Sequence, residues 1–316
     1  MVDLVTGGAG FIGRWVVKNL LSRGRKVVVI DNLSNGRKEN LEEFKNNPNL
    51  EEFIVEDIKN PLIIEKLFLE YKFSNCFHLA AQINVQESLD YPERAFENNI
   101  IGTYNILEEA RKYNTKVILI GTCMVYDLSD ADIAISEDHR IKPSSPYAGS
   151  KVASEELALS YYYGLGLPVV ILRPFNTYGP FQKTNMEGGV VSIFVNLKLK
   201  DEYLKIFGDG TQTRDLLYVE DCAEFIVLAS ENENCIGEII NAGTGKDISI
   251  NDLAMVIVKD EKRIIHVKHH HPQSEIMKLV CDNSKAKRLL NWEPKTTLEK
   301  GILKLEIWFK KNEMHD

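Results

Sequence analysis

Short apolar runs alternate with longer amphipathic stretches through the first half of the chain. The runs are rich in valine and isoleucine and end near turn residues, which predicts β-strands; they cover residues 2–6, 26–30, 52–55, 76–79, 116–120 and 168–172. The stretches between them repeat apolar residues at helical spacing. Strands that are apolar throughout, separated by helices, predict an α/β fold with a doubly wound parallel sheet.

The pattern changes after Arg173. Loops rich in Gly, Pro and Asn lead into short mixed elements, and one last amphipathic helix is predicted near residues 297–312. We therefore expect a smaller C-terminal lobe beside the sheet.

Charge and cysteine content narrow the possible partners. The 38 basic and 46 acidic residues give a net charge of −8, with no basic run that would hold a nucleic acid. No run of 18 apolar residues occurs and residues 1–6 already form a predicted strand, so we expect no membrane span, no cleavable signal and a cytoplasmic location. The five scattered cysteines predict free thiols. Three adjacent histidines, 269–271, would point to alternate faces of an extended segment, so we expect no metal site.

A glycine-rich turn follows the first predicted strand and opens a helix. Gly7 allows the tight turn, Gly10 lets the backbone approach a pyrophosphate, and Gly13 lets the helix lie close to the sheet. The N–H groups at the helix start, next to Phe11 and Ile12, favour an anion. The turn therefore predicts a Rossmann-type dinucleotide site.

The second predicted strand ends at Asp31, 18 residues after Gly13. A carboxylate there accepts hydrogen bonds from the adenosine ribose and repels a 2′-phosphate, which favours NAD as the cofactor. Arg37 lies close enough on the same loop to keep NADP open as the alternative. We assign residues 1–173, with a return around 215–244, to an NAD-binding Rossmann domain and 174–316 mainly to a substrate-binding lobe.

Tyr147 and Lys151 are four residues apart and share one face of a predicted helix, and Thr122 follows the strand at 116–120. Together with the glycine turn, these residues resemble the extended short-chain dehydrogenase/reductase family of nucleotide-sugar epimerases and dehydratases, such as UDP-glucose 4-epimerase. The resemblance covers nearly the whole chain. Further matching pieces are Asp57-Ile58, His78-Leu79-Ala80-Ala81, Asn99-Ile100-Ile101-Gly102-Thr103, Arg173-Pro174-Phe175-Asn176, Phe207-Gly208-Asp209-Gly210, Arg214-Asp215, Tyr218-Val219 and Asn241-Ala242-Gly243.

The resemblance implies an NAD enzyme that transiently oxidises C4 of a nucleotide-linked sugar. Tyr147 would be the acid/base, Lys151 would lower its pKa and hold the nicotinamide ribose, and Thr122 would bond the reacting oxygen. The implied cofactor site adds Asn32, Asp57, Ile58, Leu79, Ala80, Ala81, Asn99 and Pro174.

The resemblance also implies a substrate site and a dimer. Asn176 and Arg214 would meet the sugar diphosphate, and the loop around Val190 would cover the base. This chain lacks an arginine that many members carry after the histidines, and Gln273 or one of the histidines 269–271 would bind the substrate in its place, which leaves the nucleotide, usually UDP, open. Residues 82–88, Met124 and 175–186 are expected to line the sugar pocket. The stretches 95–113 and 147–163, with three tyrosines at 161–163, are expected to pair in a homodimer.

Two residues after Thr122 separate the possible reactions. Family dehydratases carry Asp-Glu there, whereas this chain has Cys123 and Met124. A thioether carries no proton, which argues against standard 4,6-dehydration and favours a UDP-hexose or UDP-N-acetylhexosamine 4-epimerase. The alternative gives Cys123 a proton-transfer role at C5 of an unusual 5,6-unsaturated or 4-keto UDP-N-acetylhexosamine. A non-enzymatic NAD-binding regulator is the third reading, and the intact Tyr147 and Lys151 pair argues against it.

Overall fold

Seven parallel strands form the central sheet. The computed structural model describes residues 1–127, 133–184, 189–268 and 277–312. The strand order is β10-β6-β5-β4-β1-β2-β3, and every pairing in this sheet is parallel. The bounds are β1 Val2–Thr6, β2 Lys26–Ile30, β3 Leu50–Ile54, β4 Asn75–His78, β5 Lys116–Ile120, β6 Val169–Pro174 and β10 Ile239–Ala242. The predicted doubly wound α/β fold is confirmed.

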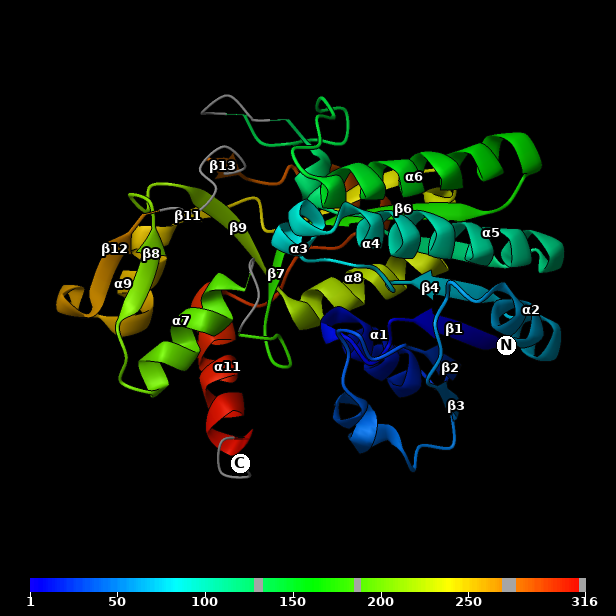
Figure 1. The fold of residues 1–316 in the computed structure, drawn as a ribbon, viewed down its shortest axis with the longest axis horizontal. Helices are drawn as coiled ribbons and strands as arrows, with labels where there is room; N and C mark the ends of the chain where they lie inside the picture. Colours follow the sequence, from blue (N-terminus) through cyan, green and yellow to red (C-terminus); the bar gives the residue numbers. More distant parts are fainter. Residues whose placement is uncertain (128–132, 185–188, 269–276, 313–316) are drawn as a thin grey trace.

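Helices cover both faces of this sheet (Figure 1). One face carries α1 Phe11–Ser22, α8 Val219–Glu231 and α10 Ser284–Leu290, whose apolar residues join one core cluster with Trp292. The other face carries α2 Pro61–Tyr71, α5 Gly102–Tyr113 and α6 Pro146–Leu165. The short helices α3 Val85–Asp90 and α4 Pro92–Phe96 pack against α6. None of the described helices is long and apolar enough to cross a membrane.

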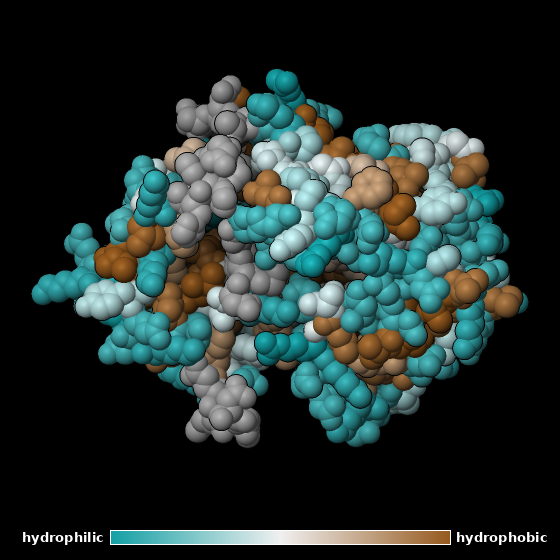
Figure 2. All heavy atoms as spheres, viewed as in Figure 1, coloured by the Kyte–Doolittle hydropathy of each residue, from teal (hydrophilic) through white to brown (hydrophobic). Residues whose placement is uncertain are grey.

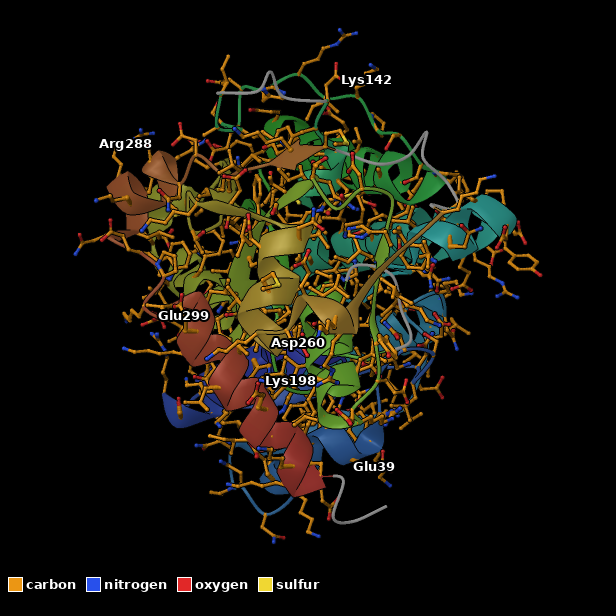
Figure 3. The ribbon with its side chains drawn as sticks, turned by 90° about the vertical axis from the view of Figure 1, so that its left-hand side faces the viewer. Glu39, Lys142, Lys198, Asp260, Arg288 and Glu299 are labelled. Atoms are coloured by element: carbon orange, nitrogen blue, oxygen red, sulfur yellow. The ribbon has the colours of Figure 1, made fainter. Side chains whose placement is uncertain are left out.

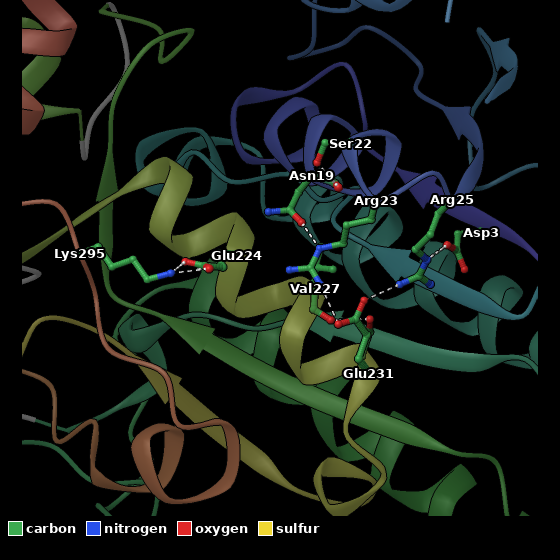
Figure 4. Close-up of polar contacts among 10 residues, drawn as sticks. Asp3, Asn19, Ser22, Arg23, Arg25, Glu224, Val227, Glu231 and Lys295 are labelled. Atoms are coloured by element: carbon green, nitrogen blue, oxygen red, sulfur yellow. Dashed lines mark hydrogen bonds and ion pairs between the residues drawn. The ribbon is translucent and has the colours of Figure 1, made fainter. Parts of the chain in front are cut away.

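Ion pairs fasten α8 to the edge of this layer (Figure 4). Arg23, just after α1, places its guanidinium 2.7 Å from Glu231 at the end of α8, and Arg25 pairs with Asp3 of β1 at 2.5 Å. Lys295, beyond α10, pairs with Glu224 of α8. The pair between Arg23 and Glu231 thereby holds α8 against α1, the helix that follows the glycine turn.

The C-terminal lobe has its own core. It contains α7 Val190–Leu199, α9 Ile250–Val258 and α11 Leu298–Asn312 with β7 Asn176–Tyr178, β8 Leu204–Phe207, β9 Thr213–Tyr218, β11 Asp247–Ser249, β12 Ile264–Val267 and β13 Lys278–Leu279. β9 pairs with β7, β11 and β13, while β8 pairs with β12. Figure 3 shows Lys198 of α7 beside α11, where its ammonium lies 2.6 Å from Glu306.

Several segments after residue 173 return to the Rossmann layer, so a single boundary near residue 173 does not separate the two lobes. β10 lies beside β6, and α8 packs on α1, in the region of the expected return around 215–244. Beyond that return, α10 and Trp292 also pack on the Rossmann layer. The division into 1–173 and 174–316 stays a prediction.

Candidate active site

The glycine turn brings backbone closer than side chains would allow. Gly7 has φ +70°, and a Cβ there would lie 2.7 Å from the Ala80 nitrogen. A Cβ on Gly13 would lie 2.1 Å from the Gly7 carbonyl oxygen. Gly10 caps α1 without a side chain, so the first N–H groups of the helix face the cleft that Gly10, Phe11 and Ile12 line. These residues fit a dinucleotide pyrophosphate.

Asp31 lines the same cleft next to the glycine turn, directly after β2. Its carboxylate accepts from the Ala9 N–H at 3.0 Å and the Leu33 N–H at 2.8 Å, which fixes its orientation. Burial raises the pKa of Asp31, and these two bonds oppose the rise. Asn32 donates to Asp57 at 3.0 Å and joins the ends of β2 and β3.

A single cleft of about 890 Å³ connects these groups to the catalytic candidates. It brings together most of the predicted cofactor residues, namely Gly7, Gly10, Phe11, Ile12, Gly13, Asp31, Asn32, Asp57, Ile58, Leu79, Ala80, Ala81, Tyr147, Lys151 and Pro174, as well as Thr122. Asn99 is not among the residues that line the cleft. Its side-chain amide accepts from the Gln82 N–H and donates to the Ser150 hydroxyl. Sequence reasoning missed Ser34, Asn35, Gly36, Lys59, Arg94 and Glu97, several of which follow the C-terminal ends of β2 and β3.

The start of α6 presents Tyr147 and Lys151 to the cleft. Ser145 caps this helix by accepting from the Ala148 N–H, and Pro146 occupies its first turn. The two residues are one turn apart and both buried. The Lys151 ammonium donates to the Ile120 carbonyl at 2.5 Å, at the end of β5. The capped start of α6 and the end of β5 thus fix the positions of Tyr147 and Lys151.

Burial sets the protonation of both groups. It raises the pKa of Tyr147 to about 12, and a hydrogen bond with Thr122 opposes this rise. It lowers the pKa of Lys151 to about 8, while the Glu155 carboxylate raises it. Tyr147 is therefore a phenol at neutral pH, and it needs nearby positive charge to act as a base.

Cys123 and Met124 form the short 3₁₀ turn Cys123–Val125 directly after Thr122, whose hydroxyl accepts from the Met124 N–H at 3.2 Å. Cys123 is only 3% exposed, in a cluster with Phe175 and Cys281. Burial raises the pKa of its thiol to about 12, although Arg214 lowers it. Neither Cys123 nor Met124 is among the described residues that line the cleft.

The predicted substrate residues lie on the C-terminal lobe. Asn176 is in β7, and its Oδ1 atom is buried with no hydrogen-bond partner among the described residues. Arg214 is in β9, close enough to Cys123 to affect its pKa, and Val190 begins α7. Gln273 and the histidines 269–271 lie outside the described residues. Within the described ranges no three His, Cys, Asp or Glu side chains gather as metal ligands.

Comparisons with known proteins agree along the chain. The profile of the GDP-mannose 4,6-dehydratase family matches residues 4–305. A UDP-glucose 4-epimerase of Mycolicibacterium smegmatis is 36% identical over 313 residues, 98% of this chain and 99% of the relative. The structure of Pal from Bacillus thuringiensis is 56% identical, with a TM-score of 0.96 over 99% of this chain and 100% of that one. A Thermus thermophilus UDP-glucose 4-epimerase in complex with NAD is 32% identical, with a TM-score of 0.89 over 98% of this chain and 99% of that one.

Proposed function

Because this chain belongs to the GDP-mannose 4,6-dehydratase family within the extended short-chain dehydrogenases/reductases, we propose that it is a 4-epimerase of a UDP-hexose or UDP-N-acetylhexosamine. Membership confirms the resemblance, and it confirms that the protein is an enzyme and that NAD is its cofactor. The reaction, the sugar and the nucleotide that carries it are the proposed parts.

One observation carries the proposal. Thr122, Tyr147 and Lys151 meet at one end of the cleft, and the two residues after Thr122 are a buried thiol and a thioether. Epimerisation at C4 needs one group that takes and returns the proton of the C4 hydroxyl. Dehydration needs further acid/base groups at C5 and C6, and Met124 has no proton to give.

The residues then have separate tasks. The glycine turn and Asp31 would hold NAD, which would supply a hydride acceptor at one face of C4 and a hydride donor for the return to the other face. Tyr147 takes the hydroxyl proton as C4 becomes a ketone and gives it back as the carbinol re-forms. Thr122 bonds to the oxygen of C4 and lowers the pKa of Tyr147. Asn176 and Arg214 hold the diphosphate, so that the sugar can turn while the nucleotide stays in place.

A second candidate function rests on Cys123. Its thiol lies close enough to Tyr147 to raise the pKa of that phenol, and its own pKa of about 12 makes it a proton donor rather than a base. Such a donor suits a 5,6-unsaturated UDP-N-acetylhexosamine. There the hydride that leaves C4 for NAD would return at C6, and the thiol would give a proton to C5, so that the double bond is saturated as C4 becomes a ketone.

Turnover in D₂O separates the two reactions. We expect the epimerase to leave C5 and C6 unlabelled, Cys123→Ala to keep most of its turnover, and Tyr147→Phe to lose about 10²-fold or more. Cys235→Ala, a buried cysteine on the short turn Glu233–Cys235, is the matched control for loss of a core sulfur. Deuterium at C5 in products identified by NMR, together with an inactive but folded Cys123→Ala, would replace the first candidate by the second.

We also propose a cytoplasmic location and a homodimer. All five cysteines are free and buried, which suits a reducing compartment.

A panel of UDP-, dTDP-, GDP- and CDP-sugars tests which nucleotide the substrate carries, and we expect turnover of the UDP-linked sugars.

A further inference from the structure

The segment after β7 runs from the C-terminal lobe to the glycine-turn helix α1. We call residues 179–183 the strap. Phe181 within it has φ +72°, in the left-handed region that costs a non-glycine residue about 1 kcal/mol or more. Such a conformation persists only where the surroundings hold it.

Aromatic and cationic side chains hold the strap. The Phe181 ring lies 4.0 Å from the Arg14 guanidinium carbon and 5.0 Å from the Trp308 ring of α11. The Trp15 indole donates to the Pro180 carbonyl at 3.3 Å. Arg14 is 1% exposed and follows Gly13 directly, so the strap is tied to the helix that bears the pyrophosphate turn.

The next residues of the strap enter the cleft. Gln182 is fixed at both ends of its amide, because its nitrogen donates to the Thr177 carbonyl at 3.0 Å and its oxygen accepts from Ser192 at 2.6 Å. Lys183 then lines the cleft within electrostatic reach of Asp31 and Arg37. Burial and Arg37 lower the pKa of Lys183, and Asp31 raises it. Residues 175–186 were expected at the sugar pocket, whereas Lys183 interacts electrostatically with Asp31, the residue expected at the adenosine ribose.

We propose that Lys183 is a cofactor-binding residue, which the strap carries from the C-terminal lobe onto the adenosine half of NAD. Its ammonium donates to a ribose hydroxyl oxygen while Asp31 accepts from the hydroxyl hydrogens. NAD is then held between the two lobes and is retained between turnovers. The Lys183 charge also offsets the charge of Asp31, which reduces the repulsion of a 2′-phosphate and so makes the preference for NAD over NADP smaller.

Release of the cofactor tests this role without measuring turnover. We expect NADH to dissociate from Lys183→Met about tenfold faster than from the wild type. The dissociation rate is measured by NADH fluorescence after dilution or after capture of the free cofactor. Lys200→Met is the control, because it removes the same charge from an exposed position at the end of α7. The ratio of NADP to NAD dissociation constants should rise in Lys183→Met and stay unchanged in Lys200→Met. Equal release rates in Lys183→Met and the wild type would overturn the proposal.

A second pair of variants tests the strap. Phe181→Ala removes the ring between Arg14 and Trp308, so Lys183 should lose its position and NADH should again leave faster. In the Phe181→Ala background, Lys183→Met should add less than about twofold, because both changes remove one interaction. If Lys183→Met speeds NADH release as much in the Phe181→Ala background as in the wild type, then Phe181 does not position Lys183. Thermal unfolding of each variant without cofactor separates loss of folding from loss of binding.

Discussion

At the scale of single residues, burial decides which protonation state each catalytic candidate starts from. The pKa of Tyr147 is raised to about 12 mainly by burial, and among the groups that act on it Thr122 lowers it. Lys151 instead donates to the Ile120 carbonyl. Thr122 therefore tunes Tyr147 directly, and Lys151 is positioned by the end of β5.

This tuning predicts a shift in pH dependence. Thr122→Val removes the bond that lowers the pKa of Tyr147, so a smaller fraction of the phenol is ionised at any given pH. The acidic limb of the kcat/KM profile should move to higher pH by about half to one unit, since such a bond is worth about 1 kcal/mol. A profile that falls in height with its limb unmoved would contradict this tuning role. Thr103→Val, at a buried threonine that contacts His78, is the control.

The sequence could group these residues because their spacing along the chain is local, while their catalytic roles stay predictions. Gly7, Gly10 and Gly13 are tied to one turn, and Tyr147 and Lys151 to one helix face. Lys183 was not predicted as a cofactor residue, because its place beside Asp31 depends on how Phe181 packs between two lobes. Cys123 was expected at the sugar, and only the fold shows how deeply it is buried.

At the scale of elements, a buried ion pair joins the catalytic helix to the sheet. Glu155 of α6 is 1% exposed and receives a bidentate contact from Arg173 of β6, with its closest approach at 2.7 Å. Arg173 also donates to the Tyr126 hydroxyl at 2.9 Å, which donates to Asn241 of β10 at 2.7 Å. A Cβ on Gly121 would lie 2.1 Å from the Glu155 carboxylate, so strand and helix approach closely here.

Breaking this pair should be costly. Glu155→Gln leaves the Arg173 charge buried without its partner, and we expect the free energy of unfolding to fall by about 3 kcal/mol in urea titration. Glu156→Gln is the matched control, because it makes the same change at the next residue of α6, which is exposed. A loss in Glu155→Gln no larger than in Glu156→Gln would show that the pair does not hold α6 in place.

Burial of both faces helps to predict a strand but does not fix its bounds, since β6 is Val169–Pro174 where 168–172 was expected and β4 is Asn75–His78 where 76–79 was expected. β1, β2 and β5 have the expected bounds because their apolar runs are uninterrupted. β3 begins two residues before the expected start, since it is the edge strand and exposes Glu51 and Glu52. The short strands of the C-terminal lobe have no such run, and their order follows from contacts with β9 that no local pattern encodes.

At the scale of the whole molecule, one face of the Rossmann layer exposes apolar side chains. Figure 2 shows brown and tan groups among the polar surface over α4, α5 and α6. Phe96 is 54% exposed and Tyr104 46% exposed, and a groove of about 380 Å³ is lined by Phe96, Ile100 and Pro146. Tyr161, which was expected on this surface, is buried and bonds to Glu108 of α5 instead. An apolar face of this kind is typical of an interface.

We predict that this face pairs two copies of the chain. Two-fold symmetry would set α5 and α6 of one protomer against the same helices of the other, which covers Phe96 and Tyr104 on both. Light scattering should give twice the chain mass of 35.9 kDa at micromolar concentration. Phe96→Glu with Tyr104→Glu should shift the mass toward one chain, because a charge is costly to bury in an apolar interface. Leu303→Glu makes the same kind of change at an exposed residue of α11 and should leave the mass unchanged. A wild-type protein of single-chain mass would exclude the dimer, whereas a dimer that survives the double change would place the interface on another face.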